Sequence, residues 1–305
     1  MKKTIIFLIL LTFLTSCGVI SQSKEQIQIP EVHSGTQGIV LEFMEGMPPN
    51  EIYQGRHFEI MLNIYNKGAA DIKGGMLKIS TEAQQISIEG ERDLRFDIEG
   101  KSVFNPEGTQ TRKSFRAQAQ PLIAQIETYN TPITATACYP YHTEATALMC
   151  IDTDIAGMVK NKPCRPTTQV MTGGQGGPVA ITSVEPKMTT HKDPEKIQPE
   201  FLIKLQNKGT GQAMKSLKVY DACTGKPLGQ DSWNVVEISA EMSDTPLTCK
   251  PEIIRISTDT TVICSFEQGI EKNRGTYTAP LSIKLNYGYM DRIVKNIQVK
   301  KLVPS

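Results

Sequence analysis

The sequence lacks an excess of charge of either sign. Among its 305 residues, 33 lysines and arginines balance 32 aspartates and glutamates, which gives a formal net charge of +1. Proteins that bind nucleic acid over a broad surface carry a strong basic excess or a clustered basic face. We therefore expect no nucleic-acid partner. Hydrophobic residues make up 39% of the chain, which is enough for a sizeable core, and the length suggests about two domains.

Short catalytic and metal-binding motifs are also missing. The chain has only four histidines, and neither His-x-x-x-His nor Gly-x-Ser-x-Gly occurs in it. No two cysteines have the Cys-x-x-Cys spacing that is typical of zinc sites. The nearest approach to a calcium motif is Asp152-x-Asp154, but a hard cation needs six to eight oxygen ligands. We therefore expect no cofactor, no metal and no enzymatic activity, and we favour a solvated strand end for the two aspartates while leaving calcium binding open.

Long apolar runs are absent except at the start of the chain. Lys2 and Lys3 precede an uncharged apolar run of 11 residues, Thr4 to Leu14, which is too short to span a membrane and typical of a signal peptide. We therefore predict a signal peptide over residues 1–16, and an uncleaved anchor helix is the alternative. Residues 17–37 are polar and lack a sustained period, which predicts a flexible stalk.

The sequence Leu14-Thr15-Ser16-Cys17 resembles the lipobox of prokaryotic lipoproteins. This resemblance implies cleavage before Cys17 and attachment of lipid to its sulfur. The lipid would hold the mature chain at the outer face of the cell membrane. An ordinary cleavage site that happens to contain a cysteine is the alternative.

The body of the sequence is dominated by period-two alternation, as in Phe58, Ile60, Leu62 and Ile64. Turn residues such as Asn66-Lys67-Gly68 separate the alternating runs. Many short strands that each have one apolar face are typical of β-sandwiches. The fold class is therefore predicted to be all-β.

An internal repeat divides the body. The strand that ends in Asn66-Lys67-Gly68 matches one that ends in Asn207-Lys208-Gly209, and each is followed by a predicted strand, the second of these at Leu217–Tyr220. Residues 132–141 match residues 280–289, and both stretches end in Tyr-x-Tyr. We therefore predict two tandem immunoglobulin-like sandwiches, over residues 38–166 and 179–303, with a Gly-rich linker over residues 167–178.

These features resemble the CARDB-type, immunoglobulin-like domains of prokaryotic surface proteins. A strand that ends in Asn-x-Gly and leads to a second strand is shared with that family. The stretch from Cys138-Tyr139-Pro140-Tyr141 to Cys150-Ile151-Asp152 and the joint GGQGGPVAIT are similar to predicted archaeal surface proteins. The resemblance implies adhesion or scaffolding at the cell surface and supplies no catalytic residues.

Six cysteines remain in the body, and an even number in an exported chain indicates disulfide bonds. Cys138 and Cys150 are predicted to pair across a hairpin centred on Glu144, because the two arms would reach the same level of the ladder. Cys249 and Cys264 bracket two short predicted strands and are expected to pair in the same way. Cys164 and Cys223 remain, and a bond between them would join the two domains.

Three classes of function follow. The first is a non-enzymatic interaction or scaffolding protein, lipid-anchored at the cell surface, whose partner is an unknown surface protein or polymer. The second is a module that binds a carbohydrate or cell-wall polymer, and the third is a hydrolase whose site has no recognisable motif. An unprotected edge strand would favour a protein partner, and a row of exposed aromatics on one sheet face would favour a polymer. A deep polar pocket with strongly shifted titrating groups would favour an enzyme.

Overall fold

The computed structural model describes residues 31–257 and 260–302. The predicted signal peptide and Cys17 lie outside these residues. Within them, no helix is long and apolar enough to cross a membrane. The described chain is mostly β-strand, so the predicted all-β class is confirmed.

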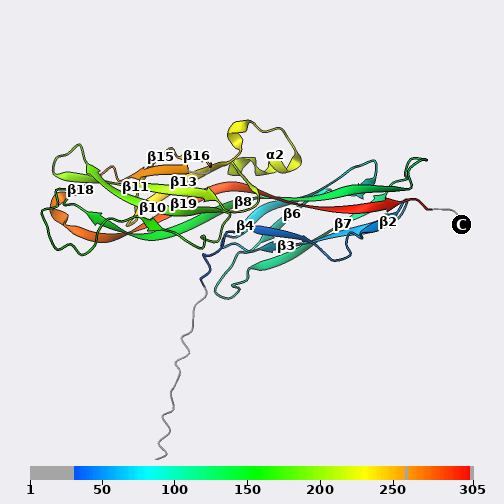
Figure 1. Ribbon diagram of the computed structural model, residues 1–305, viewed down its shortest axis with the longest axis horizontal. Helices are drawn as coiled ribbons and strands as arrows, with labels where there is room; N and C mark the ends of the chain where they lie inside the picture. Colours follow the sequence, from blue (N-terminus) through cyan, green and yellow to red (C-terminus); the bar gives the residue numbers. More distant parts are fainter. Residues whose placement is uncertain (1–30, 258–259, 303–305) are drawn as a thin grey trace, which may run out of the picture. The chain divides into compact units, whose positions relative to one another are not determined.

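The largest sheet has nine strands and is built around two long ones, β8 and β19 (Figure 1). Its path follows the order β14 (Thr245–Pro246), β13 (Val235–Met242), β19 (Thr276–Lys300), β8 (Thr128–Asp152), β4 (Ile72–Thr81) and β6 (Asp93–Ile98). Three short strands lie off this path: β12 (Gln212–Met214) and β2 (Glu51–Tyr53), which pair with β19, and β16 (Ile253–Arg255), which pairs with β13.

Two smaller sheets cover the nine-stranded one. A four-stranded sheet has the order β1 (Ile39–Phe43), β3 (His57–Asn66), β7 (Thr109–Ala119) and β5 (Ile86–Glu89). A six-stranded sheet has the order β15 (Thr248–Lys250), β17 (Thr260–Ser265), β11 (Lys196–Asn207), β10 (Val179–Thr190) and β9 (Gln169–Val170), and β18 (Ile270–Glu271) pairs with β11. The helical segments are η1 (Ser216–Lys218), α2 (Val219–Thr224), η2 (Gln230–Ser232) and η3 (Lys272–Arg274).

The two long strands run antiparallel along their whole length, from Thr128 opposite Lys300 to Asp152 opposite Thr276. We call the four-stranded sheet, β4, β6 and the adjoining parts of β8 (128–138) and β19 (290–300) the first sandwich. The six-stranded sheet, β13 and the remaining parts of β8 and β19 form the second sandwich. Each long strand therefore belongs to both sandwiches.

This exchange of strands explains why two separate sandwiches, divided at residues 167–178, are not confirmed. Residues 141–152 follow the first sandwich in sequence but pair with β19 in the second. The predicted hairpin at Glu144 is wrong, because alternate residues of β8 remain buried from Thr131 to Ile151 without a break. A continuous pattern of this kind describes one strand and leaves no turn. One buried core runs through both sandwiches as a result.

The Gly-rich segment does connect β8 to β10, but its second half is buried. Ala69 donates a backbone hydrogen bond to Gly176 at 2.8 Å, and Gly176 donates one to Gly35, also at 2.8 Å. A Cβ atom added at Gly174 would lie 2.3 Å from the Gly35 carbonyl oxygen, and the φ angle of Gly174 is +72°. The glycines therefore allow backbones to approach closely.

The predicted strand at Leu217–Tyr220 is also wrong. This stretch forms η1 and the start of α2. The strand of the second sandwich that corresponds to β4 is instead β13, which pairs with β19 as β4 pairs with β8. The segment that contains α2 is thus an insertion between the repeated turn and β13.

Candidate functional site

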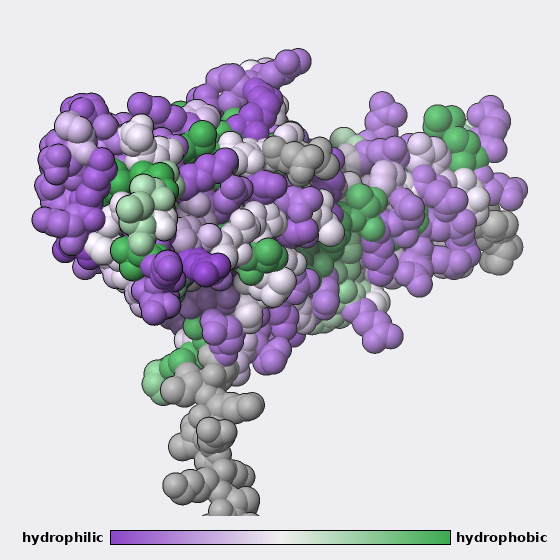
Figure 2. Space-filling model, turned by 60° about the vertical axis from the view of Figure 1, so that its left-hand side comes forward, coloured by the Kyte–Doolittle hydropathy of each residue, from purple (hydrophilic) through white to green (hydrophobic). Residues whose placement is uncertain are grey.

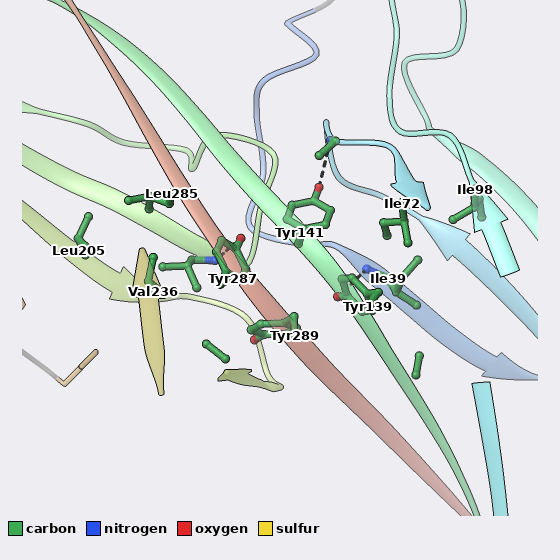
Figure 3. Close-up of a cluster of buried hydrophobic side chains, with 14 of the residues drawn as sticks. Ile39, Ile72, Ile98, Tyr139, Tyr141, Leu205, Val236, Leu285, Tyr287 and Tyr289 are labelled. Carbon is green, nitrogen blue, oxygen red and sulfur yellow. Dashed lines mark hydrogen bonds between the residues drawn. The ribbon is translucent and has the colours of Figure 1, made fainter. Parts of the chain in front are cut away.

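Four tyrosines meet where β8 and β19 pass from one sandwich to the other (Figure 3). Tyr139 and Tyr141 lie on β8, directly opposite Tyr289 and Tyr287 on β19. Neighbouring ring centroids are 5.8–6.2 Å apart, and the rings are tilted or edge-to-face. All four side chains are buried. The cluster is therefore a packed centre of the fold whose rings are not exposed to a ligand.

The hydroxyl groups of this cluster show that the internal repeat is real. The Tyr139 hydroxyl accepts a hydrogen bond from the backbone N–H of Ile39 at the start of β1, at 3.0 Å. The Tyr287 hydroxyl accepts the corresponding bond from Val179 at the start of β10, at 3.3 Å. The predicted equivalence of these two tyrosines is thereby confirmed.

The repeated asparagines are equivalent in the same way. Each ends a strand and uses its side-chain amide to close the turn that follows. Asn66 donates to the carbonyl of Ala70 at 2.8 Å, and Asn207 donates to that of Gly211 at 2.9 Å. In both turns the side-chain oxygen accepts a hydrogen bond from the backbone N–H two residues later.

The two copies of the repeat differ at a position beside these hydroxyl groups. Thr143 and Asp291 are related by the same offset of 148 residues as the two tyrosines. Thr143 makes a 2.7 Å hydrogen bond with the Tyr287 hydroxyl, whereas Asp291 accepts one from the Tyr139 hydroxyl, also at 2.7 Å. Burial raises the pKa of Asp291 from 3.8 to about 6, and the hydrogen bond from Tyr139 opposes this rise. The Tyr287 hydroxyl therefore meets a neutral threonine, whereas the Tyr139 hydroxyl meets a carboxyl group.

Asp291 borders a cleft of about 180 Å³ whose wall includes Tyr289 and Lys208. Burial also raises the pKa of Tyr289 well above its usual range, so its hydroxyl keeps its proton at neutral pH. No histidine, cysteine or second carboxyl group is among the residues that line this cleft. Among the residues that line it, the cleft therefore presents one carboxyl group together with a lysine and a tyrosine.

A larger groove of about 600 Å³ lies beside β8 in the second sandwich. One wall is residues 144–148 of β8, and the other is formed by residues between Gln169 and Gln175, with Glu31 and His33. Ala145 and Ala147 project toward the core, whereas Glu144 and Leu148 are exposed. Within the described residues, β8 has no strand partner here other than β19. The groove is therefore an open edge of the second sandwich.

Asp152 and Asp154, the candidate calcium ligands, are held by a lysine. The Lys162 ammonium lies 2.6 Å from Asp152 Oδ2 and 3.1 Å from Asp154 Oδ2. Asp154 also accepts backbone hydrogen bonds from Met158 and Val159, which lower its pKa to about 2. The described residues contain no group of three or more histidine, cysteine, aspartate or glutamate side chains arranged to hold a metal ion. Lys162 therefore occupies the position in which a cation would meet both carboxylates.

Calcium is accordingly expected to leave the stability of the protein unchanged. We expect the melting temperature of the full chain to be the same, within error, with and without calcium at about 5 mM, a concentration above the range that extracellular calcium modules require. Magnesium at the same concentration is the control for ionic strength. A rise in melting temperature that is specific to calcium would contradict this assignment.

The six body cysteines form three disulfides, but two of the predicted pairings are wrong. Cys249 pairs with Cys264, as predicted. Cys138 pairs with Cys223, and Cys150 pairs with Cys164. Cys138 and Cys150 lie on one continuous strand, so they cannot face each other across a hairpin. The three bonds indicate that the chain folds in an oxidising compartment.

Comparisons with known proteins give no family. No protein-family model and no curated protein sequence matches the chain. Among solved structures, a secreted serine protease, VesC from Vibrio cholerae, has 7% identity and a TM-score of 0.22, and the match covers 87% of this chain and 52% of the protease. The CupB6 tip adhesin from Pseudomonas aeruginosa has 10% identity and a TM-score of 0.18, with 88% and 98% covered. The chain thus spans about half the length of the protease, and these similarities are too low to bear on function.

Proposed function

We propose that this protein is an exported, lipid-anchored and non-enzymatic interaction module that binds another protein at the cell surface. The observation that carries this proposal is the groove beside β8, where a sheet edge that could pair with another chain is left open. Three disulfides and two sandwiches that share their long strands support it, because they provide a rigid frame for such an edge.

The alternative, binding of a carbohydrate or cell-wall polymer, has less support. Polymer-binding surfaces place several exposed aromatic rings in a row. In the described residues, the aromatic side chains exposed by half or more lie on separate elements: Tyr53 on β2, Phe104 between β6 and β7, and Tyr220 on α2. On the face shown in Figure 2, hydrophobic residues form small separate patches among hydrophilic ones.

Affinity capture would test the choice between these partners. The full chain is immobilised and exposed to surface extracts of the source organism, either untreated or digested with protease beforehand. We expect the retained material to be protein and to disappear after digestion. Retention of a polysaccharide from both extracts would contradict the proposal and favour the alternative.

The lipid anchor is a separate prediction. We expect the mature chain to begin at Cys17 and to carry lipid on its sulfur, because the apolar run ends in Leu14-Thr15-Ser16-Cys17. Mass spectrometry of the N-terminal peptide from native membranes measures this directly. The variant Cys17→Ser should lose the lipid and leave the membrane fraction. An unmodified Cys17 in a secreted product would refute the anchor, though not the export of the chain.

A further inference from the structure

A loop at the end of β8 presents three apolar side chains to solvent. We call residues 153–165, which follow the strand, the tip loop. Ile155, Met158 and Val159 lie within five residues of one another, and their side chains are 49%, 82% and 54% exposed. Single apolar side chains on a surface are ordinary, but three within one short loop indicate an interaction site.

The tip loop is fastened to the second sandwich at both of its ends. The disulfide between Cys150 and Cys164 closes it, with the two Cα atoms 5.9 Å apart. At its start, the Thr153 hydroxyl donates to the carbonyl oxygen of Lys272 in η3 at 2.8 Å. The loop therefore holds its exposed side chains in place before any ligand arrives, which lowers the entropy that binding costs.

The backbone of the loop is satisfied without water at the residues that carry these side chains. The N–H groups of Met158 and Val159 donate to the Asp154 carboxylate at 3.0 and 2.7 Å. The N–H of Gly157 donates to the Asp154 carbonyl at 3.2 Å. The Lys162 ammonium, 3.1 Å from the carboxylate, opposes its charge. Because unsatisfied backbone groups oppose entry into an apolar phase, these bonds prepare the loop for such an environment.

The charge around the loop is basic. Four side chains are exposed and form no ion pair with another described residue: Lys160, Arg165, Lys272 and Arg274. The two aspartates of this region share Lys162, and Glu271 pairs with Lys196 at 3.6 Å. The connection over residues 191–195, which contacts η3, adds one lysine and two acidic residues. Basic side chains therefore outnumber acidic ones at this end of the second sandwich by two.

This combination favours a lipid surface over a protein partner. The residues that dominate protein interfaces are enriched in tryptophan, tyrosine and arginine, whereas valine is under-represented among them. The exposed side chains of the tip loop are all aliphatic or thioether groups. Apolar side chains beside exposed lysines and arginines are typical of segments that enter the interface of an anionic membrane.

We infer that the tip loop inserts Ile155, Met158 and Val159 into the surface of an anionic phospholipid bilayer, where the neighbouring basic side chains contact the lipid headgroups. The membrane that carries the proposed lipid anchor is the bilayer within reach, because a tether raises the effective concentration of a second contact. The loop thus adds a second attachment to that membrane. This inference goes beyond the proposed function, since it needs neither a protein partner nor the groove beside β8.

Binding to vesicles tests the inference. The test uses the chain that the predicted cleavage leaves, from residue 17 onward, with Cys17→Ser so that it carries no lipid of its own. It is sedimented with vesicles of phosphatidylcholine, either alone or with about 30% phosphatidylglycerol. We expect saturable binding to the anionic vesicles, binding to the neutral ones at least about tenfold weaker, and slower amide hydrogen exchange over residues 155–160 on the anionic vesicles. No binding to the anionic vesicles, equal binding to both kinds, or protection confined to other residues would overturn the inference.

Two variants separate the tip loop from other exposed apolar side chains. Met158→Ser removes the most exposed apolar side chain of the loop without adding charge, and should weaken binding to the anionic vesicles at least about fivefold. Leu217→Ser is the matched control, because Leu217 is 92% exposed on η1, outside the loop, and this variant should bind as the unmodified chain does. Circular dichroism checks that both variants fold. Unchanged binding by Met158→Ser, or an equal loss in Leu217→Ser, would overturn the inference.

The inference and the proposed function fail separately. Vesicle binding involves no protein partner, so its absence would leave the capture of a surface protein unaffected. Failure of that capture, in turn, would leave vesicle binding in place. If Met158→Ser binds vesicles normally but no longer captures the surface protein, the tip loop is a protein contact and the inference is overturned.

Discussion

Replacing Cys138 and Cys223 together by alanine is expected to lower the free energy of unfolding by about 4–5 kcal/mol. This disulfide joins residues 85 apart in sequence, and a crosslink that closes a long loop removes much conformational freedom from the unfolded chain. It also fastens α2 to the outer face of β8, where both cysteines pack in a small apolar cluster with Met76, Met214 and Val219. Loss of the bond therefore frees the inserted helix.

The bond between Cys150 and Cys164 provides a matched comparison. It spans only 14 residues, so its removal as a pair of alanines should cost about 3 kcal/mol. Denaturant unfolding of both double variants under the same conditions measures the two values. Hydrogen exchange should show faster exchange over residues 219–224 in the first variant only. An equal or reversed order of the two costs would show that the long loop does not determine the effect.

Local pattern was sufficient to predict several strands of this fold and the two matches of its repeat. Alternation of apolar residues predicted β3 and β11, and the Asn-Lys-Gly turns that follow them have equivalent hydrogen bonds in both sandwiches. Such features depend on neighbouring residues alone. For this reason they can be read from a single sequence.

The pairing of the long strands could not be read in that way. The segment from Tyr141 to Glu144 has neither glycine nor an Asn-Gly pair, so it lacks a turn signal, yet nothing local indicates that β19 lies beside it. Ala137 lies opposite Asp291, a residue more than a hundred positions away. The predicted bond between Cys138 and Cys150 depended on a hairpin at Glu144, so this one error gave both cysteines the wrong partner.

A similar limit explains the error at α2. Leu217 and Val219 alternate as in a strand, but Leu217 is 92% exposed and Val219 is buried against β8 in the other sandwich. The disulfide to Cys138 and this packing favour a helical turn over the strand that alternation suggests. Tertiary contacts of this kind override local preference.

At the candidate sites the two copies of the repeat have different residues, and this difference can be read from the sequence. Aligning the two copies at the offset of 148 residues places Asp291 opposite Thr143 and Ala147 opposite Lys295. Each pair differs in charge at a position that faces inward. Differences between copies therefore mark the positions where the two sandwiches have distinct properties, although their burial and partners required the structure.

The charge at Asp291 is expected to destabilise the protein at neutral pH, so Asp291→Asn should be more stable than the unmodified chain. The pKa of Asp291 is raised from 3.8 to about 6, mainly by burial, so the folded state favours the protonated carboxyl group. The stability that protonation provides is fully present below about pH 4 and is lost as the pH rises through about 6. A shift of this size corresponds to up to about 3 kcal/mol.

Thermal or denaturant unfolding of both proteins from pH 4 to pH 8 measures this effect as a difference, which removes the contribution of other titrating groups. Asp291→Asn should match the unmodified chain near pH 4 and exceed it by up to about 3 kcal/mol above pH 7. The reverse change at the equivalent position, Thr143→Asp, should place a carboxyl group beside the Tyr287 hydroxyl and lower stability as the pH rises. A difference between Asp291→Asn and the unmodified chain that is independent of pH would contradict the assignment, because replacing the side chain affects packing equally at every pH, whereas only a titrating carboxyl group produces a change centred near pH 5.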